Sequence, residues 1–196
     1  MKKMKKLLIG SALSLSIFGF QLHADAAVNH KVKSGETFWK IASKYGVPIH
    51  NLMNVNNRTS SQLNVGETLE IPASISQAEK DLLARLVSAE AKGESYAGKV
   101  AVATVVLNRV DHPKFPNTIK GVIYQISGGH YAFSPVQNGA INRPADSASK
   151  KAVNEALAFR GGGKGSIYFY NPKTAKSSWI KSRPVTTKIG NHVFAL

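Results

Sequence analysis

The chain has 196 residues and a formal net charge of +15, from 26 Lys and Arg against 11 Asp and Glu. This length accommodates one good-sized domain with a small module, but not two large domains. Cysteine is absent, which excludes disulfides, a thiolate nucleophile and a zinc site built on sulfur. The surplus of positive charge favours polyanionic partners. Nucleic acid is not expected among them, because the sequence has no stripe of aromatic and basic residues that would stack single-stranded bases.

The N-terminal segment, residues 1–26, has the pattern of a secretory signal. Lysines precede an apolar run from Leu7 to Phe20, and small residues follow up to Ala26. The pattern predicts cleavage after Ala26 and no stable membrane insertion afterwards. An uncleaved anchor is the alternative, but the apolar run is shorter than the roughly 20 residues that span a bilayer.

Cleavage would leave the mature chain strongly basic. Residues 1–26 contain four Lys and Asp25, so their removal takes the formal charge from +15 to +12. Anionic wall polymers are therefore candidate partners outside the cell. The same charge is equally compatible with solubility and loose adhesion to the wall.

Residues 30–72 predict a small unit of strand, helix, helix and strand. Apolar residues at helical spacing follow the first strand, and Gly46 ends that helix. A second helix begins after Pro48, and residues 66–72 have the pattern of a closing strand. The segment HKVKSGETFWKIASKYGVPIHNLMNVNNRTSSQLNVGETLEIP resembles the LysM module over its whole length.

This resemblance implies a peptidoglycan-binding module, at residues 28–73, with a βααβ fold. Such a module binds glycans that contain N-acetylglucosamine in a shallow groove between two loops. Carried over position by position, the glycan-binding residues are Gly35, Glu36 and Thr37 on one loop and Asn64, Val65 and Gly66 on the other. For the glycines, a plain role in the turns is an equal alternative.

The second unit, residues 77–196, begins after a linker too short for free movement. Ser76 and Glu79 fit a capping box at the start of a helix. The apolar residues Leu83 and Leu86 then recur at helical spacing, and Glu90 falls on the same stripe.

The rest of this unit is predicted to be mainly helical with a small sheet. A buried helix is expected to precede Pro113, and a third to begin at Asp146 or Ser147. The Gly- and Pro-rich residues between them are expected to form an active-site loop. The ranges are 97–108 and 146–161 for the helices, 127–145 for the loop, and 166–171 and 192–195 for the sheet.

Acidic residues are scarce beyond Pro72, and most have structural explanations. Helix caps, a helix end or a pair with Lys151 account for Glu79, Asp81, Asp111, Asp146 and Glu155.

Glu90 is different, because an inward carboxyl group must be paired or protonated. Desolvation raises the pKa of such a group, which suits a general acid that protonates a glycosidic oxygen. A buried salt bridge to Arg85 or Arg109 is the alternative. Glu94, one turn later, is a second acid, a substrate contact or an exposed residue.

Other reaction types fit the sequence less well. The six histidines show no H-E-x-x-H or comparable metal spacing, and no G-x-S-x-G elbow occurs. No metal or other cofactor is therefore expected.

Several motifs in order resemble the SleB/CwlJ type of cell-wall hydrolase, the family of spore cortex-lytic enzymes. The motifs are LARLVSAEAKGESYAGKVAV (83–102), VLNRV (106–110), FPNT (115–118), FSPV (133–136), YNP (170–172) and IGNHVF (189–194). The resemblance implies an α+β architecture in which the LysM module precedes a lysozyme-like, mainly helical domain with a small β-sheet. It also implies lytic transglycosylase chemistry between N-acetylmuramic acid and N-acetylglucosamine, with Glu90 as the single acid and base.

Further groove positions follow from the same resemblance. Substrate-binding residues would be Glu94, Phe133, Gln137, Tyr168, Tyr170, Asn171 and Trp179. Core packing is the competing role for Phe133, Tyr168 and Trp179. The expected partner is the peptidoglycan glycan strand, and the expected location is the cell wall or the spore cortex or coat.

Three questions stay open at this point. Because the N-terminal module is LysM, the sequence does not separate spore cortex from vegetative wall as substrate. An N-acetylmuramoyl-L-alanine amidase is one alternative function. A wall-binding or spore-coat protein without catalysis is the other.

Overall fold

The computed structural model describes residues 28–162 and 165–196, so the predicted signal segment lies outside the described residues. The first unit contains β1 (Val28–Lys31), α1 (Phe38–Tyr45), α2 (Ile49–Val55) and β2 (Thr68–Ile71). The two strands are antiparallel, with Val28 opposite Ile71. This is the βααβ order that the sequence predicts.

Local signals set the ends of these helices. Thr37 caps α1 by accepting a hydrogen bond from the Lys40 N–H at 3.2 Å. Gly46 ends α1 in the left-handed region, at φ 64°, where a side chain would be strained. Pro48 then precedes α2.

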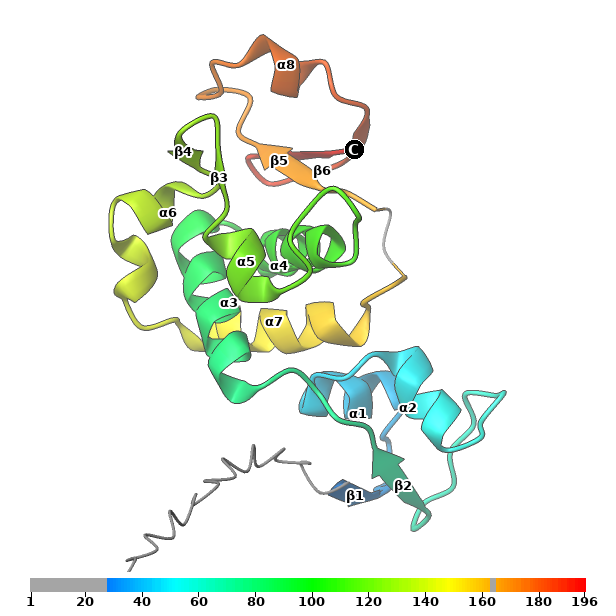
Figure 1. Cartoon of the computed structure of the whole chain (residues 1–196). Coiled ribbons are helices and arrows are strands. Elements are labelled where there is room, and N and C mark those ends of the chain that lie inside the picture. Colours follow the sequence, from blue (N-terminus) through cyan, green and yellow to red (C-terminus); the bar gives the residue numbers. More distant parts are fainter. Residues whose placement is uncertain (1–27, 163–164) are drawn as a thin grey trace, which may run out of the picture.

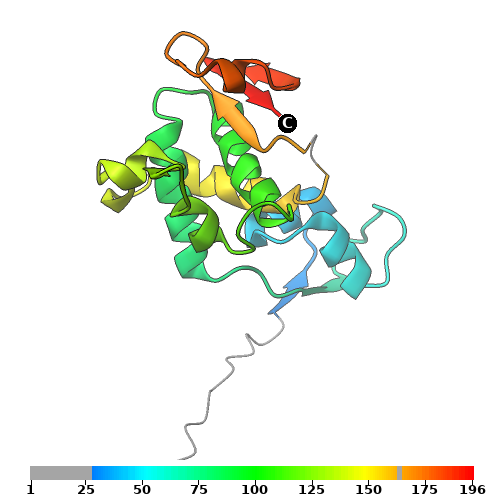
Figure 2. The same cartoon turned by 45° about the horizontal axis from the view of Figure 1, so that its top comes forward.

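The second unit is built on three long helices with a small sheet at one end (Figures 1 and 2). The long helices are α3 (Gln77–Glu90), α4 (Tyr96–Val110) and α7 (Ser147–Ala158). The sheet has the order β5-β7-β6 and is antiparallel. Its strands are β5 (Tyr168–Tyr170), β6 (Val185–Ile189) and β7 (His192–Ala195).

The long helices begin at the polar caps that their sequences indicate. Ser76 and Glu79 form a reciprocal capping box at α3. Ser95 caps α4, and Asp146 caps α7 by accepting from the Ser149 N–H at 2.6 Å. No helix within the described ranges is both long and apolar enough to cross a membrane.

The connecting regions are more ordered than the sequence pattern indicates. The predicted loop contains β4 (His130–Tyr131), α6 (Ser134–Gln137) and the 3-10 helix η1 (Ala140–Asn142), and β3 (Ile126–Ser127) pairs with β4. Two short helices were not predicted, α5 (Ile119–Ile123) and α8 (Ser178–Lys181). Each is only four or five residues long, too short for a periodic signal.

Two details of the third helix differ from the prediction. It ends at Ala158, before the glycines that were expected to stop it. The expected pair of Glu155 with Lys151 is wrong, because the Glu155 carboxylate accepts a hydrogen bond from the Tyr96 hydroxyl at 2.7 Å. Glu155 therefore pairs with Tyr96 of α4 instead of Lys151 of its own helix.

The two units are packed together rather than only joined by the linker. Ala158 of α7 belongs to the buried apolar cluster of the first unit, and Trp39 of α1 lies 6.5 Å from Phe159 between ring centroids. Lys80 of α3 donates to the Tyr45 carbonyl at 2.8 Å. Figure 1 shows α1 beneath α7 accordingly.

Candidate active site

Glu90 is the last residue of α3, at the end of its buried apolar face. Leu83, Leu86 and Val87 on that face are fully buried, which turns the Glu90 side chain inward. Burial raises the pKa of the Glu90 carboxyl group from 4.5 to about 7, although the Arg109 guanidinium opposes the rise. The carboxyl group is therefore a mixture of protonated and ionised forms at neutral pH.

Arg109 of α4 is the positively charged residue that lowers the pKa of this carboxyl group. Its side chain is 8% exposed, and its Nε donates to the Ile167 carbonyl at 2.7 Å. Its guanidinium lies 5.1 Å from the ring centroids of Phe115 and Phe133. It also lies 5.6 Å from the Tyr168 ring, so three aromatic rings surround it.

This surrounding explains the charge state of Arg109. Burial lowers the pKa of the guanidinium to about 10, while Tyr168 and Glu90 act in the opposite direction. Arg109 therefore stays charged at neutral pH. Within the described residues no ion pair joins Glu90 to Arg85 or Arg109 at 4.0 Å or less, so the salt-bridge alternative for Glu90 is not formed.

Glu94 follows in the turn after α3, and its environment is different. Its carboxylate accepts two hydrogen bonds from Asn191, from the backbone N–H at 3.1 Å and from Nδ2 at 3.0 Å. Burial, the largest single effect, raises the pKa of Glu94, but these two bonds and the charge of His192 act together in the opposite direction, and the net pKa is lowered. The side chain thus ties the turn after α3 to the turn between β6 and β7.

The turn that Glu94 holds requires a glycine. Gly190 has φ +57°, and a Cβ built on it would lie 2.0 Å from the Glu94 Oε2. Any larger residue at this position would displace the carboxylate. The sequence left Glu94 as a second acid, a substrate contact or an exposed residue, and the structure shows both of its oxygens already engaged by Asn191.

A group of aromatic residues extends from Arg109 to the surface. Tyr168 of β5 contacts Trp179 of α8 edge to face, at 5.2 Å between centroids. Arg183 covers both rings, at 5.6 Å and 5.4 Å. Trp179 is 53% exposed, so this part of the group can contact a sugar face.

The remaining groove positions fall into different environments. Phe133 is 3% exposed and packs against Phe169, so it supports the cage around Arg109. Gln137 is exposed at the end of α6, and Tyr170 is half-buried on β5. Asn171 shapes a turn, where its side chain accepts from the Lys173 N–H at 2.9 Å.

The predicted LysM loops do lie side by side. The Gly66 N–H donates to the Val32 carbonyl at 2.8 Å, which joins the second loop to the start of the first. Val65 is 70% exposed, and Gly35 and Asn64 are exposed as well.

The other residues of the first loop have structural partners. Glu36 accepts from the Lys33 N–H and contacts His30 at 2.7 Å, while Thr37 caps α1. The exposed positions are therefore the freest to contact a ligand.

Several residues of the site have weak signals in the sequence. Arg109 was considered only as an ion-pair partner, although an arginine at the end of a long apolar helical run is a sign of a buried cation. Phe115, Arg183 and Asn191 reach the site only through the fold. Within residues 28–162 and 165–196, no three His, Cys, Asp or Glu side chains gather closely enough to hold a metal ion.

Comparisons with known proteins agree with the two-unit structure. Residues 93–195 match the Cell Wall Hydrolase family, and residues 30–72 match the LysM domain. The chain belongs to the cell wall hydrolase family. The family match begins three residues after Glu90, so it includes Arg109 and the aromatic group but not Glu90 itself.

Several curated relatives of this cell wall hydrolase are spore cortex-lytic enzymes. The protein from Halalkalibacterium halodurans is 40% identical over 133 residues, which cover 68% of this chain and 39% of the relative. The protein from Oceanobacillus iheyensis is 34% identical over 173 residues, covering 85% and 60%. The chain thus spans between about two fifths and three fifths of the length of these relatives.

Two solved structures resemble the second unit. The catalytic domain of the germination-specific lytic transglycosylase SleB from Bacillus anthracis is 40% identical, with a TM-score of 0.58, and covers 64% of this chain and 100% of that domain. The catalytic domain of Bacillus cereus SleB is 41% identical, with a TM-score of 0.56, covering 64% and 95%. The predicted α+β architecture, with a LysM module and a lysozyme-like domain, is confirmed.

Proposed function

We propose that this cell wall hydrolase is a secreted lytic transglycosylase that cleaves peptidoglycan between N-acetylmuramic acid and N-acetylglucosamine. Glu90 acts first as the acid, donating its proton to the oxygen of the glycosidic bond. It then acts as the base and accepts the proton of the muramyl 6-hydroxyl, whose oxygen closes an anhydro ring. Glu90 thus ends the cycle protonated, ready for the next bond.

The observation that carries this proposal is the position of Glu90 at the end of the buried apolar face of α3, where desolvation raises the pKa of its carboxyl group to about 7. A group with that pKa can donate and accept a proton at neutral pH with little energetic cost. The charged Arg109 limits the rise of the pKa, so that the carboxylate form stays accessible for the second step.

Among residues 28–162 and 165–196, Glu94 is the acidic residue nearest in sequence to Glu90, and its engagement elsewhere favours a transglycosylase over a hydrolase. Hydrolysis with inversion or retention normally uses two carboxyl groups. Both carboxylate oxygens of the neighbouring Glu94 already accept hydrogen bonds from Asn191. A mechanism in which the substrate supplies its own hydroxyl nucleophile needs only Glu90.

In this proposal the LysM unit holds the enzyme on the wall. Glycan would contact exposed positions of its two loops, among them Gly35, Asn64 and Val65. Tethering raises the local concentration of substrate without changing the chemistry. The domain limits 28–73 and 77–196 and export through residues 1–26 are parts of the same proposal.

The products of digestion test the reaction type. Purified vegetative wall and spore cortex are each digested with residues 27–196, and the fragments are analysed by mass spectrometry. The expected muramyl ends are anhydro forms, which lack the mass of one water relative to hydrolytic ends. Hydrated reducing ends would indicate a hydrolase, and free stem peptides would indicate an amidase.

Two variants complete this test. Glu90→Gln should give no anhydro ends while the protein still sediments with wall. Asp81→Asn, which removes a carboxylate from the first half of the same helix, should digest like the wild type. Wild-type protein that binds wall and releases no fragments would make the chain a wall-binding protein and refute the proposal.

A further inference from the structure

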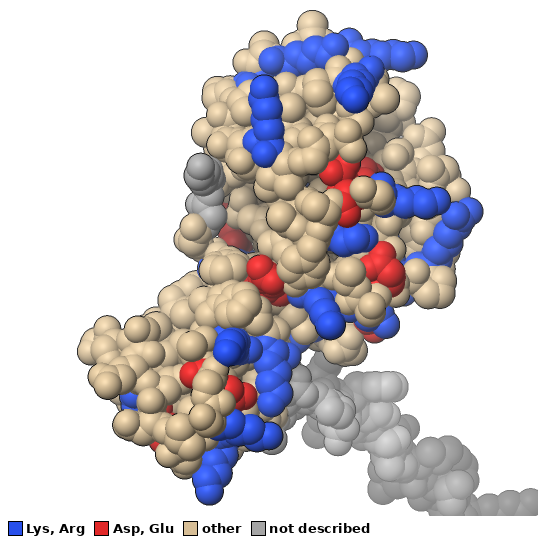
Figure 3. All heavy atoms as spheres, turned by 180° about the vertical axis from the view of Figure 1, so that it is seen from behind, with Lys and Arg blue, Asp and Glu red and all other residues tan. Residues whose placement is uncertain are grey.

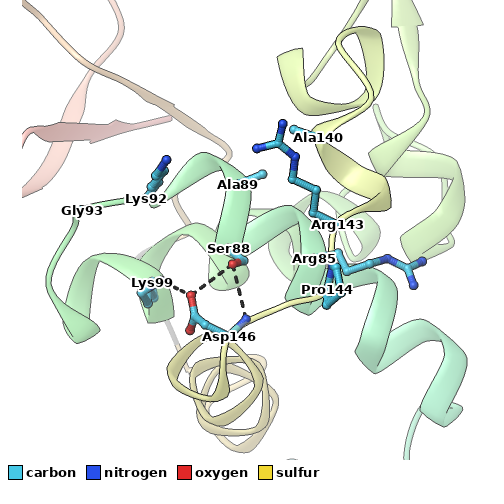
Figure 4. A pocket seen from close by; sticks show the side chains of 10 residues that line it. All are labelled: Arg85, Ser88, Ala89, Lys92, Gly93, Lys99, Ala140, Arg143, Pro144 and Asp146. Atoms are coloured by element: carbon cyan, nitrogen blue, oxygen red, sulfur yellow. Dashed lines mark hydrogen bonds and ion pairs between the residues drawn. The ribbon is translucent and has the colours of Figure 1, made fainter.

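A hollow lies beside the C-terminal half of α3, on the side of the helix that carries Ser88 and Ala89 (Figure 4). Its volume is about 330 Å³, which is within the usual size of ligand pockets. Arg85, Ser88 and Lys92 recur along it at helical spacing, and Ala89 between them directly precedes Glu90. Arg143, from the segment after η1, closes the opposite side.

The charge in this hollow is unbalanced. Four basic side chains line it, those of Arg85, Lys92, Lys99 and Arg143, against the single acid Asp146. Figure 3, which shows the opposite face of the molecule from Figure 1, has basic side chains spread over both units. The hollow differs from that general surplus because its basic groups gather around one concave surface.

The only acid of the hollow has other partners. Asp146 accepts hydrogen bonds from the Ser149 N–H at 2.6 Å, from Lys99 Nζ at 3.0 Å and from the Ser88 hydroxyl at 3.1 Å. These bonds cap α7 and neutralise Lys99. Asp146 therefore leaves the charges of Lys92 and Arg143 uncompensated.

Lys92 and Arg143 are the two groups free to receive a ligand. Both are exposed, and within the described residues neither side chain forms a hydrogen bond or an ion pair. Figure 4 shows them on either side of Ala89, while the Arg85 guanidinium points away from them. The Arg85 Nε is buried without a hydrogen-bond partner among the described residues.

We infer that this hollow, named here the Lys92–Arg143 pocket, binds a carboxylate of the peptide stem on the muramic acid held at Glu90. The inference rests on the proposed function and adds to it a preference for glycan that carries stems. Two cations around a concave surface attract an anion and can hold it by charge-assisted hydrogen bonds.

The position of the pocket favours the stem over other wall anions. Cleavage by Glu90 requires a muramic acid beside the end of α3, and the peptide stem is covalently attached to that sugar. Ala89 lies on the pocket side of the same helical turn as Glu90. The stem carboxylate is part of the substrate, so binding of the substrate at Glu90 places it near the pocket. Phosphate polymers of the wall are also anionic, but they are not attached to the bond that is cleaved.

Direct binding tests the pocket without relying on activity. The free stem peptide is titrated into residues 27–196 by calorimetry, with the wild type and with the double variant Lys92→Gln/Arg143→Gln. The expected affinity of the double variant is about tenfold lower, the size of one charge-assisted hydrogen bond. The control Lys114→Gln/Lys120→Gln removes the same charge from exposed positions outside the pocket and should bind like the wild type.

Cleavage provides the second measurement. The ratio of rates on stem-bearing and stem-free glycan should exceed one for the wild type and the control, and should fall about tenfold in the pocket variant. Equal peptide affinity and an equal ratio in all three proteins would overturn the inference. Weakened binding to phosphate polymers but not to stem peptide would also overturn it, by assigning the pocket to phosphate. A wild-type protein that cleaves neither glycan would refute the proposed function. The calorimetric titration of stem peptide would still test whether the pocket binds the stem carboxylate.

Discussion

The end of α3 and the turn that follows it carry the same residue type, four positions apart, in opposite states. Glu90 ends the apolar face of the helix and has a pKa raised to about 7. Glu94 lies beside the β6–β7 turn and has a lowered pKa, because two hydrogen bonds from Asn191 favour its charged form. In the proposed mechanism the first carboxyl group transfers protons, while the second ties the turn after α3 to the β6–β7 turn.

The difference shows that the surroundings of a carboxyl group decide its role. Around Glu90, desolvation dominates and Arg109 only limits it. Around Glu94, desolvation is again the largest single effect, but the donors of Asn191 and the charge of His192 together exceed it. Proton transfer needs the first environment and a structural tie needs the second.

The largest expected difference between the two residues is in activity. Glu90→Gln should lower the rate of wall digestion by about a thousandfold, in line with the usual contribution of a general acid and base. Glu94→Gln should keep the rate within about tenfold, because only the placement of the turn changes. Initial rates of turbidity loss of wall suspensions measure both, and the reverse order would exchange the roles of the two residues.

Glu90→Gln should lower activity but raise the stability of the folded protein. Its pKa is about 7 when folded and 4.5 as reference, so the unfolded chain ionises first as the pH rises. Stability is therefore lost between about pH 4.5 and 7 and stays lower above. Glu90→Gln should remove this loss and stabilise the protein at pH 8 by at most about 3 kcal/mol.

Denaturant unfolding of both proteins at pH 4 and pH 8 measures this effect. The gain from Glu90→Gln should be confined to the higher pH. An equal difference at both values would indicate that packing, not ionisation, separates wild type and variant.

Glu94→Gln should destabilise the protein, by about 1–2 kcal/mol, because two hydrogen bonds to a charged acceptor are weakened. The lowered pKa of Glu94 stabilises the folded state above the reference pKa of 4.5. This contribution is lost as the pH falls through the folded pKa. Thermal unfolding should therefore separate wild type and variant at pH 7 and bring them together in acid, whereas a constant gap would exclude the charge of Glu94 as its cause.

The smallest expected effect is a shift of the pH profile through Arg109. Wild-type kcat/KM should decline as the pH rises above about 7, where Glu90 loses its proton. Arg109→Gln removes the charge that lowers the pKa of Glu90, so this decline should move upward by less than about one pH unit. Arg109→Lys keeps the charge and should leave the decline nearer the wild-type position. A purely structural role for Arg109 would reduce activity in both variants without moving the decline.

The packing between the two units also affects how the protein works on a wall. Trp39 with Phe159 and Lys80 with the Tyr45 carbonyl hold the LysM unit against α7 and α3. The short linker in the sequence indicated limited movement, and the structure adds an apolar contact that includes Ala158 in the first core. Glycan bound by LysM would therefore be presented to the second unit in a restricted orientation.

Local sequence signals were sufficient for the helices that carry the site. The Ser76 capping box, the Asp146 cap and the Gly46 stop are interactions between near neighbours, and each occurs as predicted. The inward position of Glu90 followed from helical spacing for the same reason. The roles of the individual groove residues stay predictions.

The sequence by itself determined the two units, their helical starts and the place of Glu90 on the apolar stripe of its helix, because these depend on periodicity and on contacts within a few residues. Only the tertiary structure decided which residues each buried or charged side chain contacts. The aromatic cage of Arg109, the bonds from Asn191 to Glu94 and the pairing of Tyr96 with Glu155 join residues that are 6 to 97 positions apart. Such contacts depend on how complete elements pack, and packing sets the desolvation and hydrogen bonding that fix the pKa of each carboxyl group.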